Sequence, residues 1–266
     1  MQTKLGAPVE APDREAHPGV VAAGATRWYA RGRVVALEGL DLRAGPGEVL
    51  GVVGPSGCGK STLLELIAGL AEPDAGFVAV GEATRAAERL GRCAYMPQRD
   101  LLLPWRSALD NAGLALESQG VRRSEARRRA RPLFERFGLD AFEGARPSEL
   151  SGGMRQRVAF LRTLLAGRPV LLLDEPFGAL DSITRAAMQE WLAGALAEEP
   201  RTVILVTHDV EEALYLSDRI VVMSPRPGRV VEEMVVDLPR PWPRREAVTD
   251  PAFAALREQA LEALEA

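Results

Sequence analysis

The chain has 266 residues, of which 47% are apolar and 26% charged, a balance typical of a folded globular protein. Its formal net charge of −4 at pH 7 excludes broad electrostatic binding to nucleic acid. We find no signal-peptide core and no apolar run near the roughly 18 residues of a membrane span, so we expect any membrane role to come through a partner. Two widely spaced cysteines, Cys58 and Cys93, indicate a reducing compartment rather than a disulfide framework.

The first half of the chain divides into a tail, a strand-rich part and a helical part. Residues 1–20 mix Pro, Ala, Glu and Gly without periodicity, so we expect a disordered tail. Short β-like pieces follow over 21–42, and the apolar run at 49–53 predicts a buried strand. Over 107–166 the apolar spacing is close to 3.6, which predicts an inserted helical subdomain.

Strands and helices alternate in the second half of the chain. Continuous apolar strands separated by helices indicate a mostly parallel sheet that is covered on both faces. We therefore predict an α/β domain over 21–243 and a C-terminal helix within 244–266. The expected elements are strands at 170–173, 202–206, 219–223 and 230–236, and helices at 182–198 and 210–216.

The most informative stretch follows the strand at 49–53 and matches G-x-x-x-x-G-K-[ST] without a gap. A strand that enters a glycine-rich turn and then a helix points several backbone N–H groups at one place, where phosphates bind. Among 33 cationic residues only Lys4 and Lys60 are lysines, so the chain keeps a lysine in this loop. The alternative is a chance match in a glycine-containing turn. The predicted ATP-binding residues are Gly54, Pro55, Ser56, Gly57, Cys58, Gly59, Lys60, Ser61 and Thr62, with Lys60 on the outer phosphates and Ser61 on Mg²⁺.

Two carboxylates end the strand predicted at 170–173. Open α/β sheets bind ligands at the carboxyl ends of their strands, so Asp174 is suited to hold Mg²⁺ through water. Glu175 is suited to act as the general base for the attacking water. An ordinary strand end is the alternative interpretation, which the phosphate loop disfavours.

A second candidate anion site begins at Ser151. This residue is a good helix N-cap, and Gly152 and Gly153 would expose N–H groups at the start of the following helix. One more capped helix is the simpler interpretation. One bound nucleotide would already fill the first phosphate loop, so a second anion site in the same chain requires an explanation.

Together these motifs resemble the ATP-binding cassette (ABC) family, in its order and spacing, over roughly residues 23–240. The resemblance implies the ABC ATPase fold: a P-loop NTPase core, antiparallel N-terminal β pieces and an inserted helical subdomain. It also implies an ATP hydrolase that uses Mg²⁺. The matching positions are Gly54–Thr62, Gln98, Leu150–Gln156, Leu171–Glu175, Ala179–Asp181 and His208.

The same resemblance implies a head-to-tail dimer that closes on two ATP molecules. Ser151, Gly152 and Gly153 of one copy would contact the γ-phosphate held by Lys60 of the other, which supplies the reason for the second anion site. Asp181 would act across the dimer interface.

Three further roles are implied at the nucleotide itself. Gln98 would contribute to the Mg²⁺ site and sense the γ-phosphate, and His208 would contact the γ-phosphate and the attacking water. Tyr29 stands at the place of the aromatic residue that stacks on adenine. Its neighbour Trp28 is the alternative, and a core aromatic is a further one.

Arg99–Arg106 and Val236–Pro241 resemble the nitrate/sulfonate/taurine importer branch of the family. This implies transmembrane permease subunits docking near Gln98–Arg106, where Leu101–Trp105 would be an exposed apolar patch unless it packs internally. A solute-binding protein would be an indirect partner, and the chain would lie at the cytoplasmic face of the inner membrane. The solute stays open among nitrate, sulfonates, taurine and thiamine-precursor pyrimidines.

Other functions within the family compete with an importer. An exporter or cell-division cassette would share every catalytic motif and differ mainly at 101–105. A cassette acting on nucleic acid or ribosomes usually has two cassettes or a long coiled-coil insertion, and this sequence shows neither. The basic run at 122–131 is interpreted as a solvated helix face, with acidic lipid headgroups or a partner as the alternative.

Overall fold

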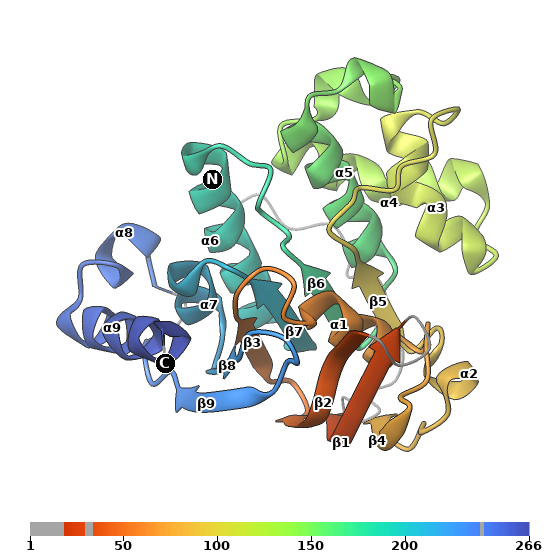
Figure 1. The fold of residues 1–266 in the computed structure, drawn as a ribbon. Helices are drawn as coiled ribbons and strands as arrows, with labels where there is room; N and C mark the ends of the chain where they lie inside the picture. The colour runs from red at the N-terminus through yellow and green to blue at the C-terminus, as the bar shows by residue number, and fades with distance from the viewer. Residues whose placement is uncertain (1–18, 30–33, 240–241, 266) are drawn as a thin grey trace.

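The computed structural model describes residues 19–29, 34–239 and 242–265. The tail expected over 1–20 lies outside these residues except for Gly19 and Val20, and Val20 already belongs to a strand. The first sheet is antiparallel, with the strand order β2-β1-β4 (Figure 1). Its strands are β1 (Val20–Tyr29), β2 (Val34–Ala44) and β4 (Ala75–Val80).

The second sheet has six strands in the order β5-β6-β7-β3-β8-β9. The first five are mutually parallel, whereas β9 runs antiparallel to β8. The predicted mostly parallel sheet is therefore confirmed. The strands are β3 (Val49–Val53), β5 (Cys93–Met96), β6 (Val170–Asp174), β7 (Thr202–Thr207), β8 (Arg219–Met223) and β9 (Val230–Val235).

Apolar layers cover both faces of the parallel sheet. Leu50 and Val52 of β3 belong to a cluster with α1 (Lys60–Ala68) and the antiparallel sheet. Val49 and Val53 belong to a second cluster, whose helices include α6 (Ser182–Glu198) and α7 (Val210–Leu216). The alternation follows from strand geometry, since neighbouring side chains point to opposite faces. Both faces are dry, which explains the continuous apolar runs in the sequence.

The helical insertion consists of α3 (Ala108–Ser118), α4 (Arg123–Arg136) and α5 (Gly152–Leu165), with short 3₁₀ turns between α4 and α5. These helices gather at one end of the molecule, away from the antiparallel sheet (Figure 1). α3 packs against both α4 and α5, and α5 returns to β5. The insertion is thus joined to the sheet close to the ends of β5 and β6.

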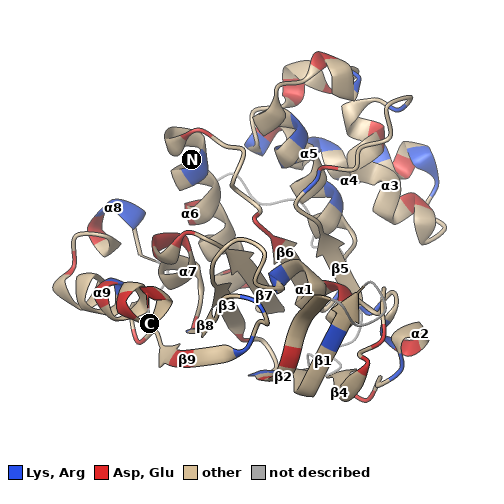
Figure 2. Cartoon of the chain, viewed as in Figure 1, with Lys and Arg blue, Asp and Glu red and all other residues tan. Residues whose placement is uncertain are grey.

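The basic run at 122–131 is largely neutralised by carboxylates, and Figure 2 shows red and blue segments interleaved over this part. Arg127 pairs with the buried Asp110 at 2.7 Å, and Arg123 pairs with the same carboxylate. These two guanidinium groups hold the pKa of Asp110 far below its usual range. Glu125 pairs with Arg128 and Arg129, and Glu143 pairs with Arg131. The run is therefore a network of surface ion pairs, which agrees with the solvated-face interpretation.

Two helices differ from expectation. The short helices α2 (Ala86–Arg89) and α8 (Arg244–Ala247) were not predicted. The C-terminal helix expected within 244–266 is α9 (Pro251–Glu265), and a short break separates it from α8. The break falls before Pro251, because proline has no N–H to donate to the preceding turn and disfavours helical geometry in the residue before it.

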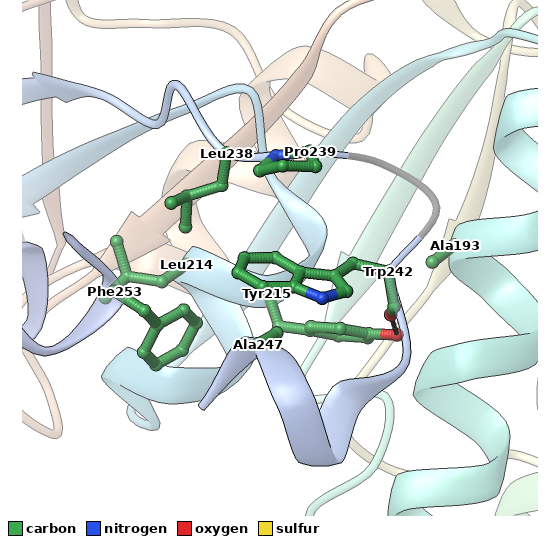
Figure 3. Close-up of a pocket in the computed structure, with 8 residues that line it drawn as sticks. All are labelled: Ala193, Leu214, Tyr215, Leu238, Pro239, Trp242, Ala247 and Phe253. Carbon is green, nitrogen blue, oxygen red and sulfur yellow. Dashed lines mark hydrogen bonds between the residues drawn. The ribbon is translucent and has the colours of Figure 1, made fainter. Parts of the chain in front are cut away.

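The C-terminal segment packs over α7. Leu238 and Trp242 face Leu214 and Phe253 in Figure 3, and the hydroxyl of Tyr215 donates a hydrogen bond of 2.7 Å to the carbonyl of Trp242. The gap left between them holds about 10 Å³, no more than one water molecule needs. This packing is therefore a closed apolar contact. Across the described part of the chain, no helix has the length and apolar character required to cross a membrane.

Candidate nucleotide site

A cavity of about 300 Å³ opens at the carboxyl ends of β3 and β6, beside the first turn of α1. This is the edge of an α/β sheet where ligands bind. Its wall contains residues from both sheets and from loops far apart in sequence. They are Tyr29, Val34, Ala36, Ser56, Gly57, Gly59, Lys60, Ser61, Thr62, Gln98, Asp174, Glu175 and Arg226.

The phosphate loop leaves the first N–H groups of α1 without side-chain caps. Gly59 is the N-cap, with φ of 107° in the left-handed region, and it has no side chain to offer. A Cβ at Gly59 would lie 2.7 Å from the carbonyl oxygen of Ala36, so only glycine fits. The uncapped N–H groups and the helix dipole favour an anion at this point.

Lys60 is held inside the loop. Its Nζ donates hydrogen bonds to the carbonyl oxygens of Gly54 at 2.7 Å and Pro55 at 3.0 Å, and it lies 3.8 Å from Sγ of Cys58. Gly54, Pro55 and Cys58 are the three predicted loop residues that do not line the cavity. They form the underside of the loop and fix the ammonium, while the remaining six line the cavity.

Asp174 lines the cavity and is 3% exposed. Burial raises its pKa, while a hydrogen bond with Ser61 acts in the opposite direction. The hydroxyl of Ser61, the amide oxygen of Gln98 and the carboxylate of Asp174 are the oxygen donors that Mg²⁺ prefers. The side chains present therefore fit a magnesium ion bound together with phosphate oxygens.

Glu175 lies between two other predicted residues. Its Oε2 accepts a hydrogen bond of 3.2 Å from Nε2 of Gln98, and its Oε1 lies 3.2 Å from Nδ1 of His208. Glu175 adopts φ of 50°, which is uncommon for a residue with a side chain and concentrates at functional sites. Its N–H still bonds the carbonyl of Val206 at 2.8 Å, so the sheet imposes this backbone geometry.

Of the two candidate aromatic residues, Tyr29 lines the cavity and Trp28 does not. The Tyr29 hydroxyl lies 3.3 Å from Oγ1 of Thr62, directly above α1. Both side chains are about 40% exposed, Trp28 at 40% and Tyr29 at 39%, so neither is a core aromatic. The geometry favours Tyr29 as the residue beside the base.

The chain is similar to known proteins of one family. A family profile described as "ABC transporter" matches residues 37–178. The taurine import ATP-binding protein of Chromobacterium violaceum is 47% identical over 85% of this chain and 88% of its own length. The chain belongs to the ABC transporter family. It is therefore an ATP hydrolase whose activity is coupled to transport.

Other relatives point in the same direction. The aliphatic sulfonates import ATP-binding protein of Rhodococcus jostii is 48% identical over 86% of each chain. The formylaminopyrimidine import ATP-binding protein of Halalkalibacterium halodurans is 47% identical over 72% of this chain and 74% of its own. A dimeric ATP-binding cassette solved in a post-hydrolysis state with ADP and Pi superposes with a TM-score of 0.76, at 31% identity, over 82% of this chain and 99% of that one. The predicted ABC ATPase fold is confirmed.

In this ABC ATPase the residues of the predicted second anion site lie apart from the cavity. Ser151 caps α5, since its Oγ accepts a hydrogen bond of 3.2 Å from the N–H of Met154. Gly153 lies against the Ala179–Asp181 loop, because a Cβ there would be 3.5 Å from the carbonyl of Ala179. Asp181 caps α6 through the N–H of Thr184 at 3.0 Å. Neither Ser151, Gly152, Gly153 nor Asp181 lines the cavity of the same copy.

The stretch after Gln98 divides its apolar residues between surface and core. Leu101 and Trp105 are 60% and 71% exposed, whereas Leu102 is buried in the core. The expected patch at 101–105 is therefore narrower than the sequence suggests. Arg162 donates to the carbonyl oxygens of Leu101 at 2.9 Å and Asp100 at 2.7 Å, which holds the exposed Leu101 in place.

Arg226 lines the cavity of this ABC ATPase although the sequence did not single it out. It lies in the loop between β8 and β9, and β8 is a neighbour of β3. Pro225-Arg226-Pro227-Gly228 is a turn sequence at the carboxyl end of a parallel strand, the edge where ligands bind. That signal is available only once β8 is known to lie beside β3.

Proposed function

We propose that this chain is the ATP-hydrolysing subunit of an importer for a small solute, acting as a head-to-tail pair beneath two permease subunits. The observation that carries the catalytic part is the position of Glu175. It contacts both Gln98 and His208 at 3.2 Å and lines a cavity that begins in a phosphate loop.

Glu175 acts as the general base. As the water oxygen attacks the γ-phosphorus, one water proton passes to the Glu175 carboxylate, and the bond to the β-phosphate oxygen breaks to leave ADP. His208 orients the water and donates to a γ-phosphate oxygen, and its contact with Glu175 keeps the two side chains aimed at the same point. Positioning and charge compensation supply most of the rate in phosphoryl transfer.

The remaining side chains compensate charge. Lys60 lies on the outer phosphates, and the N–H groups of the loop and of α1 surround them. Mg²⁺ held by Ser61, Gln98 and Asp174 would neutralise negative charge on the β- and γ-phosphate oxygens. Tyr29 would stack on the adenine at the other end of the cavity.

The dimer explains why a second anion site exists without a cavity of its own. In a head-to-tail pair, Ser151, Gly152 and Gly153 of one copy complete the γ-phosphate shell held by Lys60 of the other. Asp181, whose loop contacts Gly153, would then lie at the interface. Hydrolysis is gated by closure of the pair, and closure is the two-state element that moves the permease.

The solute class and the docking surface follow from the branch of the family. Relatives named for taurine, aliphatic sulfonates and formylaminopyrimidine support a small organic solute, with nitrate as a further candidate. The exposed Leu101 and Trp105 would receive the permease, which would hold the chain at the cytoplasmic face of the inner membrane. A solute-binding protein would deliver the solute from the other side.

Reconstitution tests this proposal. The chain, copurified with its permease and combined with the solute-binding protein in proteoliposomes, should hydrolyse ATP faster when one candidate solute is added. Taurine, an alkanesulfonate, nitrate and formylaminopyrimidine are tested separately, and solute uptake is measured alongside phosphate release. ATP hydrolysis that no solute stimulates, with ATP-driven efflux of another compound, would reject the importer assignment.

A further inference from the structure

The wall of the nucleotide cavity contains a second cation besides Lys60. Arg226 lies there with Val34 and Ala36 of β2 and with Tyr29 of β1. Tyr29 and Val34 are paired across the antiparallel sheet, so these residues form one side of the cavity. Asp174, Glu175 and Gln98 also line this cavity. The loop of Arg226 is hydrogen-bonded to Ala36, which lies two residues from Val34 and beside Gly59, so Arg226 enters on the β2 side of the cavity.

The loop that carries Arg226 is fixed against both sheets. The N–H of Gly228 donates a hydrogen bond of 2.9 Å to the carbonyl of Ala36, and the N–H of Glu38 donates one of 3.3 Å back to Gly228. A Cβ at Gly228 would lie 2.0 Å from the carbonyl oxygen of Cys58, so the loop touches the underside of the phosphate loop. Contacts on both sides of Gly228 set where Arg226, two residues earlier, enters the cavity.

Hydrogen bonds within the loop restrict it further. The hydroxyl of Ser224 donates to the carbonyl of Pro227 at 3.0 Å and accepts from the N–H of Arg229 at 3.1 Å. The N–H of Ser224 also donates to the carbonyl of Arg229 at 2.9 Å. These hydrogen bonds join the two ends of the loop, so they restrict the backbone conformation at Arg226.

The neighbouring arginines are ion-paired, whereas Arg226 is not. Arg219 pairs with Glu48 at 2.8 Å, and Arg229 pairs with Glu38 on the outer side of the loop. Within residues 19–29, 34–239 and 242–265, the guanidinium of Arg226 has neither a carboxylate partner nor a hydrogen-bond acceptor. An unpaired guanidinium in the wall of a phosphate-binding cavity has the fork of donors that matches phosphate oxygens.

We propose that Arg226 binds the α-phosphate of the nucleotide. This rests on ATP occupying the cavity as proposed above. Lys60 and the N–H groups of α1 surround the outer phosphates, while Tyr29 lies at the base. The α-phosphate comes between these two regions, beside β2, on which the loop of Arg226 packs. Arg226 would thus hold ATP and ADP equally and would not distinguish the two.

Binding measurements with the purified full-length chain test this. Calorimetry with ATP, ADP and inorganic tripolyphosphate, which has neither sugar nor base, is compared for the wild type, R226Q and R226K. Loss of a charge-assisted hydrogen bond should weaken ATP and ADP binding by a similar factor, about 5- to 20-fold for R226Q. R226K should lose less, because it keeps the charge without the fork. Tripolyphosphate should also bind more weakly to R226Q.

Two controls separate this result from loss of the site itself. R229Q lies in the same loop but outside the cavity, and its exposed ion pair is worth little, so its nucleotide affinity should match the wild type. K60A should bind neither nucleotide; normal binding by K60A would reject the nucleotide site and not Arg226 in particular.

Three results would overturn the assignment of Arg226. Unchanged affinity in R226Q would place the side chain in solvent. A loss confined to ATP would place it on the γ-phosphate. A loss for both nucleotides with unchanged tripolyphosphate binding would place it on the base or ribose.

Discussion

Nε2 of Gln189 donates a hydrogen bond of 3.1 Å to Oε2 of Glu212 in the interior of the protein. Gln189 is on α6, the helix capped by Asp181, and Glu212 is on α7, four residues after His208. Oε1 of Gln189 accepts a hydrogen bond of 2.7 Å from Arg244 of α8. The buried amide of Gln189 therefore connects three helices. They are α6 and α7, which follow the loops that contain Asp181 and His208, and α8 in the C-terminal segment.

Glu212 should make stability depend on pH. Burial raises its pKa to about 7, and repulsion from Asp209 adds to this, while Thr207, Gln189 and Arg185 act in the opposite direction. The folded state thus holds this proton more tightly than the unfolded state, whose glutamate pKa is about 4.3. The stabilising contribution is complete below about pH 4.3 and is lost as the pH rises to about 7.

E212Q removes this titration. The free energy of unfolding of E212Q relative to the wild type should rise between about pH 4.3 and pH 7 and then level off, by on the order of 3 kcal/mol in all. Urea titrations at several pH values measure it, with E258Q on the exposed face of α9 as the control. Parallel curves for E212Q and the wild type would show that Glu212 does not titrate in this range.

E175Q should bind ATP with near wild-type affinity and lose turnover by about 10²- to 10⁴-fold, the usual contribution of a general base. The amide keeps the size of the side chain and its contact with Gln98, but it cannot accept the water proton. ATP binding by calorimetry and phosphate release under saturating ATP separate these two effects. A near-normal rate in E175Q would remove Glu175 from the role of base.

S151A should leave nucleotide binding by the open monomer intact and prevent ATP-driven dimerisation, measured by light scattering in the hydrolysis-deficient E175Q background. Because Ser151 also caps α5, the variant loses about 1 kcal/mol of helix stability. S107A removes the equivalent cap of α3 and serves as the matched control. ATP-driven dimerisation that persists in S151A would argue against a phosphate contact across the interface.

The sequence predicted the elements whose boundaries are chemically marked. α6 and α7 begin after the caps Asp181 and Asp209, and both match the expected ranges of 182–198 and 210–216. The phosphate loop and the carboxylates after β6 were predicted for the same reason, since each is a local pattern with a local physical cause.

What the sequence did not predict depends on contacts between distant segments. Arg89 is fully buried because it donates to the carbonyl oxygens of Leu66 and Val78, and nothing near it in sequence indicates this or the short α2. The antiparallel direction of β9 follows from its short connection to β8. Arg226 reaches the cavity only because its loop packs on β2, about 190 residues earlier in the chain.

The sequence could not show which apolar residues of 101–105 face the solvent. Trp105 does, so a substitution there tests the predicted docking surface. Leu102 is buried and Trp105 is 71% exposed, so a charge is tolerated only at the exposed position. W105E should therefore fold normally, and the isolated chain should hydrolyse ATP at the wild-type rate because Trp105 does not line the cavity.

In the complex, W105E should lose copurification with the permease and solute-stimulated uptake, since a carboxylate replaces apolar contact area. L90E places the same charge on an equally apolar, 59% exposed position of the antiparallel-sheet side and should behave as the wild type. If W105E retains both permease binding and uptake, the permease docks elsewhere. If both variants lose them, the effect is one of added charge and the surface around Trp105 is not specific.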